Sequence, residues 1–132
     1  MKAFISIKFY SDARNRYLIE TIDEALTSNG IETACIIRDV EDWGTRTFSP
    51  NVLMEKTFEI LDDCNLLVIE FSDAGFGIGI EAGYAHAKGI KIITIAKEDS
   101  EIPTTLKGIS SNVFLYKTEK ELKNYLKKLP KN

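Results

Sequence analysis

Residues 63–97 constrain the fold more than any other part of the 132-residue chain. They begin with the run Asn65–Phe71, an almost unbroken LLVIEF, as expected of a strand covered on both faces in a parallel sheet. A glycine-punctuated loop follows, then a helix predicted from roughly Gly79 to Lys88 and another apolar strand at Ile90–Ala96. Because parallel strands need a long crossover, usually a helix, this segment predicts a βαβ unit.

Strands and helices alternate along the rest of the chain as well. Further strands are predicted at Ala3–Phe9, Ile31–Ile37 and Val113–Tyr116. Helices are predicted from Ser11 or Asp12 to about Ser28, from Pro50 to about Leu61, briefly over Pro103–Lys107, and around Leu122, Leu126 and Leu129. We therefore expect a single α/β domain over residues 1–132, a three-layer sandwich whose five-stranded parallel sheet has the flavodoxin-like order 2-1-3-4-5.

The charge balance limits the classes of partner. With a net charge of −3 and a pI of about 5.2, the chain has no sequence-wide basic field for nucleic-acid phosphates or an anionic membrane surface. No apolar run reaches the roughly 18 residues that a membrane helix needs, and the N-terminus turns polar too early for a signal peptide. We expect a cytoplasmic protein that binds a small molecule or another protein, with Cys35 and Cys64 as buried free thiols.

The loop after Phe71 lies where an open parallel sheet places its ligand, outside the carboxyl ends of the strands. Its glycines alternate with apolar residues: Gly75, Gly77 and Gly79 with Phe76, Ile78 and Ile80. This pattern predicts a backbone that approaches a ligand closely while alternate side chains anchor the loop in the core. A tight turn that needs glycine only for packing is the alternative.

The same glycines also fit a dinucleotide-binding pattern. The stretch Gly77–Ala82 matches G-x-G-x-x-A, and Glu98 follows at about the right spacing for a ribose contact. That motif belongs after the first strand of a nucleotide-binding unit, however, whereas this loop follows the third. Glu81 would also place a negative charge where a pyrophosphate should meet the helix N-terminus, so the pattern argues against a dinucleotide site.

Glu81 suits a site that needs the carboxylate itself. We expect it in the first turn of a helix, where orphan amides and the positive end of the dipole favour the ionised form. An ionised, held carboxylate can attack an anomeric carbon, form a glycosyl ester and later release it. The alternative is a surface glutamate that is merely well placed in a first turn.

The stretch Gly77-Ile-Gly79-Ile-Glu81-Ala-Gly83-Tyr84-Ala85 resembles the G-x-G-x-E-x-G-Y-A motif of the nucleoside 2-deoxyribosyltransferase family, which includes relatives that hydrolyse the N-glycosidic bond of nucleotides. Three further blocks are similar to that family. They are Phe9-Tyr10-Ser11-Asp12 with Asn15, Phe58-Glu59-Ile60-Leu61, and Gly108-Ile-Ser-Ser-Asn112-Val113. The resemblance covers most of the chain and implies a deoxyribosyltransferase-like enzyme or an N-glycoside hydrolase.

The resemblance assigns roles to particular residues. Glu81 would attack C1′ and expel the base, after which a second base or water takes the sugar. Asn112 would reach the 5′ end of the sugar, usually across a subunit contact, so at least a homodimer is expected; an asparagine that merely opens a strand is equally compatible. Phe9, Ser11 and Asp12 would line the sugar and base pocket, although helix capping also explains Ser11 and Asp12. No metal or organic cofactor is implied.

Two positions depart from the family pattern. The catalytic aspartate of the second helix falls at Thr57, which cannot exchange a proton near neutral pH. The first-strand tyrosine that hydrogen-bonds the nucleophile falls at Phe4. Asp73 in the glycine loop or Glu55, a helical turn from Thr57, could replace the missing acid, or both could be surface residues.

The remaining candidates lie in or near the loops. Residues 38–49 form a long loop, which favours a functional excursion, and Trp43 within it could stack on a base or pack as a lid. Lys8, Arg14 and Arg16 could meet a 5′-phosphate or remain solvated. Two other functions stay open: a nucleoside- or nucleotide-binding module that has lost turnover, and a signalling-type α/β domain that binds protein.

Overall fold

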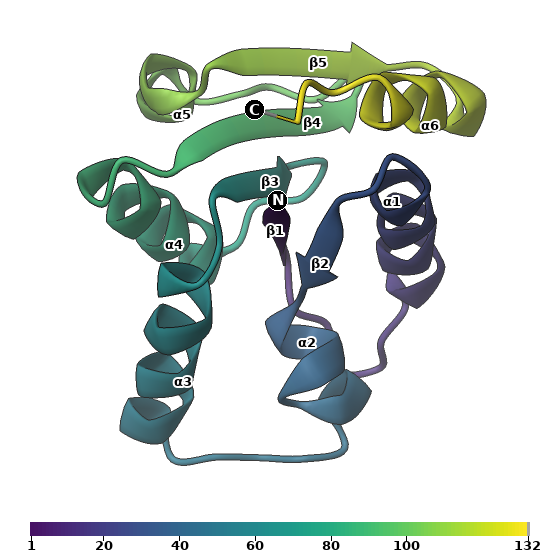
Figure 1. The fold of residues 1–132 in the computed structure, drawn as a ribbon. Coiled ribbons are helices and arrows are strands. Elements are labelled where there is room, and N and C mark those ends of the chain that lie inside the picture. The colour runs from purple at the N-terminus through teal and green to yellow at the C-terminus, as the bar shows by residue number, and fades with distance from the viewer. Residues whose placement is uncertain (132) are drawn as a thin grey trace.

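The computed structural model describes residues 1–131 and contains a five-stranded parallel sheet of order β2-β1-β3-β4-β5 (Figure 1). This order confirms the one predicted from the sequence. The strands are β1 (Lys2–Ile7), β2 (Glu32–Ala34), β3 (Leu66–Glu70), β4 (Lys91–Lys97) and β5 (Asn112–Tyr116). The helices are α1 (Arg16–Ser28), α2 (Ile36–Asp39), the 3-10 turn η1 (Asp42–Gly44), α3 (Pro50–Asp62), α4 (Phe76–Ala87), α5 (Thr104–Ile109) and α6 (Glu119–Lys127).

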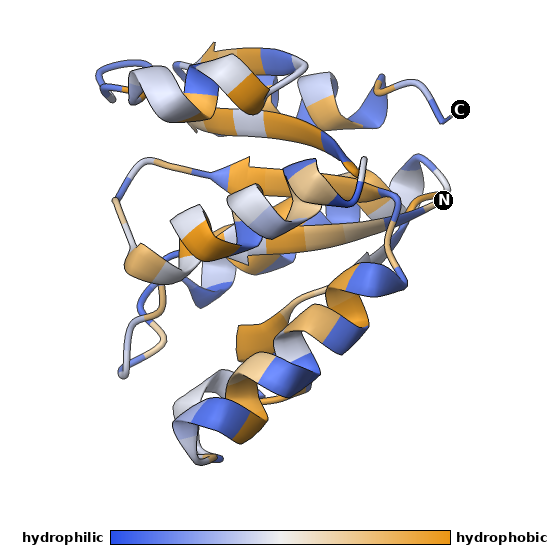
Figure 2. Cartoon of the chain, turned by 90° about the vertical axis from the view of Figure 1, so that its left-hand side faces the viewer, coloured by the Kyte–Doolittle hydropathy of each residue, from blue (hydrophilic) through white to orange (hydrophobic). Residues whose placement is uncertain are grey.

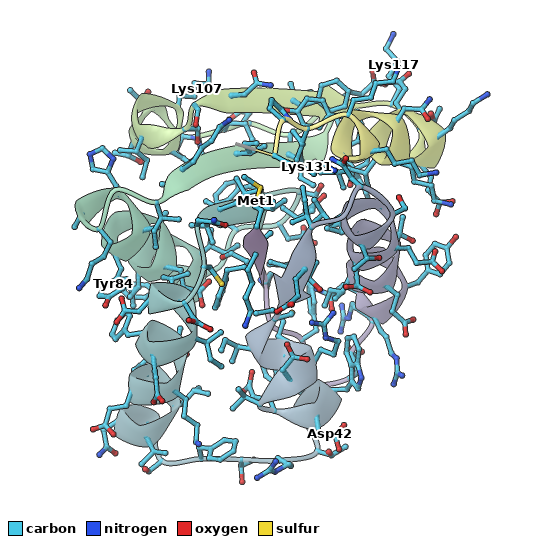
Figure 3. All side chains as sticks on the ribbon, viewed as in Figure 1. Met1, Asp42, Tyr84, Lys107, Lys117 and Lys131 are labelled. Atoms are coloured by element: carbon cyan, nitrogen blue, oxygen red, sulfur yellow. The ribbon has the colours of Figure 1, made fainter. Side chains whose placement is uncertain are left out.

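Helices cover both faces of the sheet, so the sandwich has the three layers expected. One core joins the sheet to α1 and α6, and the other joins it to α3, α4 and α5 (Figures 1 and 3). Alternate residues of β1 divide between them, with Ile5 in the first core and Phe4 in the second. The strands are the most hydrophobic part of the ribbon (Figure 2), and every residue of β3 is buried.

The segment before α1 differs from the sequence prediction. The helix begins at Arg16, with Asn15 in the N-cap position, and not at Ser11 or Asp12. A turn intervenes because Ala13 has a positive φ of 54° and its N–H donates to the Tyr10 carbonyl at 3.0 Å. The Asn15 side chain then donates to the Lys8 carbonyl at 2.8 Å, which ties this turn to the end of β1.

The second strand is much shorter than predicted. We expected a strand over Ile31–Ile37, but β2 ends at Ala34 and the chain enters α2 after Cys35. The Asp39 carboxylate accepts a hydrogen bond from the Cys35 N–H at 2.9 Å, which stabilises the start of this short helix. Because β2 lies at the sheet edge and pairs only with β1, no second neighbour extends it.

The start of α4 also differs from the prediction, which placed it at Gly79. It begins at Phe76 after Gly75 as N-cap, so Gly77 lies inside the helix and Glu81 in its second turn. The expected anchoring by alternate side chains is wrong: Ile78 is buried, but Phe76 is 89% exposed. Helical spacing, not strand-like alternation, decides which side chains face the core.

The structure also bears on the two cysteines and on the predicted absence of a membrane helix. Cys35 and Cys64 are free and buried, as predicted. No helix within residues 1–131 has the length and apolar character needed to cross a bilayer.

A buried carboxylate links the carboxyl ends of three strands. Glu70, at the end of β3, is 2% exposed and accepts hydrogen bonds from the Ser72 N–H at 2.7 Å, the Ser72 hydroxyl at 2.6 Å and the Tyr116 hydroxyl at 2.5 Å. The Ser72 hydroxyl in turn accepts from the Lys97 N–H at 2.9 Å. This network holds the chain where it leaves the sheet toward α4, because buried polar groups are stable only when they are paired.

The network predicts a stability difference between two tyrosines. Tyr116→Phe leaves the Glu70 carboxylate with one donor fewer and is expected to cost about 1.5–3 kcal/mol of unfolding free energy, measured by urea denaturation. The control is Tyr84→Phe, whose hydroxyl donates to the exposed Asp62 carboxylate at 2.5 Å, and a change within about 0.5 kcal/mol is expected there. Equal effects at both positions would contradict a structural role for the Glu70 network.

Candidate active site

A cavity of about 560 Å³ opens at the carboxyl ends of β1 and β3. Its walls come from the end of β1 and the residues after it, from α2 and the loop that follows, from the middle of α3, and from the start of α4. Most of the lining side chains are apolar, and the polar ones include Lys8, Glu41, Thr57 and Glu81. Mostly apolar walls with a few polar groups are typical of small-molecule sites, and the position is the crevice expected for an open parallel sheet.

Glu81 reaches this cavity from α4 and is held by β1. Its Oε1 accepts a hydrogen bond from the Ser6 hydroxyl at 2.5 Å. Burial raises the pKa of Glu81 to about 7; the Ser6 hydrogen bond opposes this rise, and the negative charge of Glu41 adds to it. The expected first-turn position, which would favour the ionised form, is therefore wrong: Glu81 lies in the second turn and is largely removed from water, so the neutral form is favoured instead.

Ser6 was not identified from the sequence. The resemblance placed the partner of the nucleophile at Phe4, which is fully buried and lines the cavity. Ser6 lies two residues further along β1, so its side chain points to the same face of the sheet, nearer the strand end. The hydroxyl missing at Phe4 is thus supplied from Ser6.

Thr57 lines the cavity but offers no acid. It is 2% exposed, and its hydroxyl donates to the Leu53 carbonyl within α3 at 2.8 Å. Glu55, considered as a replacement, lies on the exposed face of α3 and outside the cavity lining.

Asp73, the other replacement considered, belongs to a neighbouring cavity of about 300 Å³. Its Oδ2 accepts a hydrogen bond from the Tyr10 hydroxyl at 2.5 Å. Lys8 lines both cavities, whereas Arg14 lines only this second one. Asp73 therefore lies beside the Glu81 cavity and not in its wall, and its catalytic role stays a prediction.

Glu41 is a second carboxylate on the wall of the Glu81 cavity that sequence reasoning missed. It lies just after α2, within the long loop that the sequence marked as a functional excursion. Burial raises its pKa as well. Among residues 1–131 its carboxylate has no hydrogen-bond or ion-pair partner, although it is only partly exposed. A loop residue of this kind has no sequence signal beyond the length of the loop.

Other predicted contacts divide between the cavity and its surroundings. Phe9, Gly75 and Gly77 line the cavity, and a Cβ added at Gly77 would meet no atom within 4 Å. Gly79 lines a separate apolar groove between α4 and α5.

Three of the predicted substrate contacts lie outside the cavity lining. Asp12 pairs with Arg14 at 3.1 Å on the exposed turn after β1, and Ser11 precedes it on that turn. Trp43 packs against the α1 side of the sheet. The binding roles of Ser11, Asp12 and Trp43 stay predictions.

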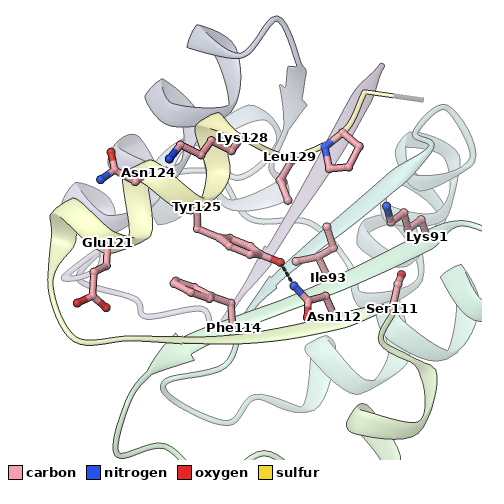
Figure 4. A pocket seen from close by; sticks show the side chains of 11 residues that line it. Lys91, Ile93, Ser111, Asn112, Phe114, Glu121, Asn124, Tyr125, Lys128 and Leu129 are labelled. Atoms are coloured by element: carbon pink, nitrogen blue, oxygen red, sulfur yellow. Dashed lines mark hydrogen bonds between the residues drawn. The ribbon is translucent and has the colours of Figure 1, made fainter.

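Asn112 lies on the other face of the sheet in a cavity of about 670 Å³ (Figure 4). Its side-chain amide donates to the Tyr125 hydroxyl, and the Tyr125 ring stacks on Phe114 with centroids 4.1 Å apart. Asn112 does not line the Glu81 cavity of its own chain, so any contact with substrate has to come across a subunit interface, and that role stays a prediction.

Comparisons with known proteins bear on the fold. No family model and no curated protein sequence matches the chain. CMP N-glycosidase BcmB of Clostridium botulinum superposes with a TM-score of 0.71 at 22% identity, over 96% of this chain and 98% of that one. For a conserved protein of Enterococcus faecalis V583 the TM-score is 0.71 at 16% identity, over 96% of this chain and 97% of that one. For the 2-deoxyribosyltransferase of Bacillus psychrosaccharolyticus the TM-score is 0.72 at 11% identity, over 95% of this chain and 92% of that one.

The chain therefore has the fold of the nucleoside 2-deoxyribosyltransferase family over nearly its whole length. The resemblance drawn from the sequence is confirmed at this level. Within residues 1–131 no group of three or more His, Cys, Asp and Glu side chains is arranged to hold a metal ion.

The raised pKa of Glu81 predicts a pH-dependent gain of stability in a neutral variant. The pKa is near 4.5 in the unfolded chain and about 7 in the folded one, so wild-type stability falls as the pH rises through this interval. Glu81→Gln keeps an oxygen for Ser6, and we expect it to be more stable than wild type by on the order of 2 kcal/mol near pH 8.5 and by about zero near pH 4.

Thermal or urea unfolding across this pH range measures the difference. The control is Glu59→Gln on the exposed face of α3, which removes a charge without relieving a buried one. A Glu81→Gln difference that does not change with pH would show that the carboxylate is not desolvated in the folded protein.

Proposed function

We propose that this protein cleaves the N-glycosidic bond of a nucleoside or nucleotide, with Glu81 as the nucleophile that carries the sugar. One observation carries the proposal: a carboxylate held by Ser6 faces a cavity at the carboxyl ends of β1 and β3. The fold shared with an N-glycosidase and a deoxyribosyltransferase supports this chemistry.

The reaction begins from ionised Glu81. At neutral pH a group with a pKa of about 7 is ionised in roughly half of the molecules. Its oxygen forms a bond to C1′ while the bond from C1′ to the base nitrogen breaks, and the bonding electrons leave with the base. The Ser6 hydroxyl fixes the position of the carboxylate before attack, which lowers the entropic cost of reaching this geometry.

The second half of the reaction regenerates Glu81. Water, or a second base, attacks C1′, and the bond to the Glu81 oxygen breaks. Water makes the protein a hydrolase, whereas a second base makes it a transferase. Adding a free base to the assay separates these outcomes, because only transfer gives a new nucleoside.

The cavity walls suggest how the substrate is held. Phe9 is 45% exposed at the cavity edge and can stack on a base. Lys8 is the one cationic side chain among the described residues that line the cavity. A cation there favours a substrate with a 5′-phosphate over the unphosphorylated nucleoside, and each nucleotide should therefore be compared with its own nucleoside.

Base release tests the proposed function. Wild type is incubated with deoxynucleosides, deoxynucleotides and ribonucleotides including CMP, and free base is measured by chromatography. Glu81→Ala is expected to fall to the uncatalysed background, and added azide, which can attack C1′ from the vacated space, is expected to restore part of the rate. If Glu81→Ala releases base as fast as wild type, Glu81 is not the nucleophile.

A binding module without turnover is the second candidate. The hydroxyl of Thr57, at the position of the family's acid, is already donated to the Leu53 carbonyl, which favours this alternative. A module of this kind would be stabilised by a nucleotide without releasing base, since a ligand at 100 times its dissociation constant adds about 2.7 kcal/mol to stability.

The glycines of α4 provide a further prediction. Gly77 lines the cavity, whereas Gly83 lies on α4 outside it, and a Cβ added at either position meets no atom within 4 Å. Alanine at either position is expected to raise unfolding free energy by about 0.5–1 kcal/mol, because glycine destabilises a helix interior.

The two alanine variants should nevertheless differ in function. Gly77→Ala places a methyl group in the space where substrate is expected, so it should lower kcat/KM for base release, or weaken the thermal shift if the protein only binds. Gly83→Ala should leave both unchanged. Wild-type kcat/KM in a stabilised Gly77→Ala variant would place the substrate elsewhere.

A further inference from the structure

The proposed reaction lacks one component, a group that gives a proton to the departing base. Most nucleic-acid bases leave as poor, negatively charged groups unless they are protonated, and a positioned acid contributes about 10²–10⁴ in rate. Thr57 cannot serve because it does not titrate near neutral pH. The other titratable side chains on the cavity wall are Lys8, Cys35, Glu41 and Glu81.

Three of these four groups are poorly suited to protonating the base. Burial raises the pKa of the Cys35 thiol to about 11, so it is a weak acid at neutral pH. Glu81 is committed to the attack on C1′. Lys8 is better suited to a phosphate, as argued above. Glu41 is the remaining carboxylate, and it reaches the cavity from α2 and its loop, across from α4.

We propose that Glu41 is the general acid and base of this site, which protonates the departing base and then accepts a proton from the attacking water. The inference rests on the proposed function, because it assigns the missing proton transfer in the same reaction. It also explains how a chain with threonine in place of the family's aspartate can still catalyse.

The backbone holds Glu41 firmly at this place. Its N–H donates to the Ile36 carbonyl at 2.9 Å, and its own carbonyl accepts from the N–H groups of Gly44 and Arg46, each at 3.0 Å. A loop residue with three backbone hydrogen bonds is positioned more like a helical residue than like a mobile one.

The turn after Glu41 has an unusual conformation. Asp42, Trp43 and Gly44 all have positive φ, at 46°, 59° and 92°. Left-handed backbone is unfavourable for residues other than glycine and persists only when the surroundings enforce it. The packing of Trp43 against the α1 side, with the Arg16 guanidinium 4.4 Å from its ring centroid, supplies that enforcement.

The Glu41 carboxylate is also free to exchange protons. It is partly buried yet has no hydrogen bond or ion pair among the described residues, whereas Glu70 has three donors. An unpaired, desolvated carboxylate favours its neutral form, and a second carboxylate on the same cavity makes double ionisation unfavourable. The pair therefore tends to hold one proton. Burial favours that proton on Glu81, and the reaction starts from the form in which the proton is on Glu41 and the Ser6 hydrogen bond stabilises the charge on Glu81.

Both steps balance with one proton shared in this way. In the first, the Glu81 oxygen bonds to C1′, the bond from C1′ to the base nitrogen breaks, and the nitrogen takes the Glu41 proton with the released electron pair. In the second, a water oxygen bonds to C1′, the ester bond to Glu81 breaks, and the proton of water moves to Glu41. The site returns to its starting state.

The test compares two leaving groups in Glu41→Gln. A substrate found in the base-release assay is compared with a second compound that has the same sugar but a positively charged base. A 7-methylpurine replaces a purine, and nicotinamide replaces a pyrimidine. A cationic base leaves as a neutral molecule and needs no proton. Base release is measured in a single turnover with enzyme in excess, so that only the first step is observed.

Glu41→Gln is expected to slow release of the ordinary base by about 10²–10⁴-fold and that of the cationic base by less than about tenfold. The wild-type rate for the ordinary base should fall at high pH as the two carboxylates lose their shared proton, and this limb of the pH profile should be absent in Glu41→Gln. Lys8, Cys35 and Glu81 also line the cavity and remain unchanged in the variant, so loss of the limb identifies Glu41.

The controls separate the possible failures. Asp42→Asn, the neighbouring exposed carboxylate on the same turn, should match wild type with both substrates. If Glu41→Gln slows both substrates equally, or neither, Glu41 is not the acid. Glu81→Gln should release base from neither substrate, whether or not Glu41 is intact. If it still releases base from both, the proposed function itself is wrong, and so is the role of Glu41.

Discussion

β3, a strand buried along its whole length between two helical layers, is the constraint on which the rest of the structure depends. A strand covered on both faces cannot carry polar side chains except at its ends, so the polar groups gather where the chain leaves it. After β1 the chain turns to α1 on one face, and after β3 it turns to α4 on the other. This divergence opens the crevice that Glu81 faces.

Three glutamates near the carboxyl ends of the strands differ in the number of hydrogen bonds that they accept, and this difference distinguishes a structural carboxylate from reactive ones. Glu70 accepts three hydrogen bonds and joins the strand ends rigidly. Glu81 accepts one, from Ser6, and its pKa rises to about 7. Glu41 accepts none among the described residues and faces the same cavity as Glu81. The carboxylate whose oxygens are occupied by three donors is structural, whereas the two that keep free oxygens in the cavity are available for reaction.

The sequence predicted the sheet and its order well, because long apolar runs and the helices between them have strong periodicity. It predicted the start of α4 poorly, since glycines that usually mark a loop lie inside the helix as Gly77 and Gly79. The carboxylate at Glu81 was correctly placed at the crevice, but its environment was not, because desolvation depends on packing that no local pattern encodes.

Ser6 and Glu41 escaped the sequence analysis for different reasons. Ser6 lies two residues from the position that the resemblance indicated, a shift that keeps the same strand face but changes the residue type. Glu41 is followed by three consecutive left-handed residues, and Trp43 among them is a residue type that gives no sequence signal for this conformation. Tertiary packing, and not local preference, positions both groups.

The central claim is that Glu81 carries the sugar as a covalent ester. The most direct measurement is peptide mapping by mass spectrometry after an acid quench of the Glu41→Gln variant with the cationic substrate, because this variant should form the ester readily and hydrolyse it slowly. The account predicts a sugar adduct on Glu81 that disappears when Glu81 is replaced by glutamine. Base release without any adduct, or with an adduct on another residue, would contradict it.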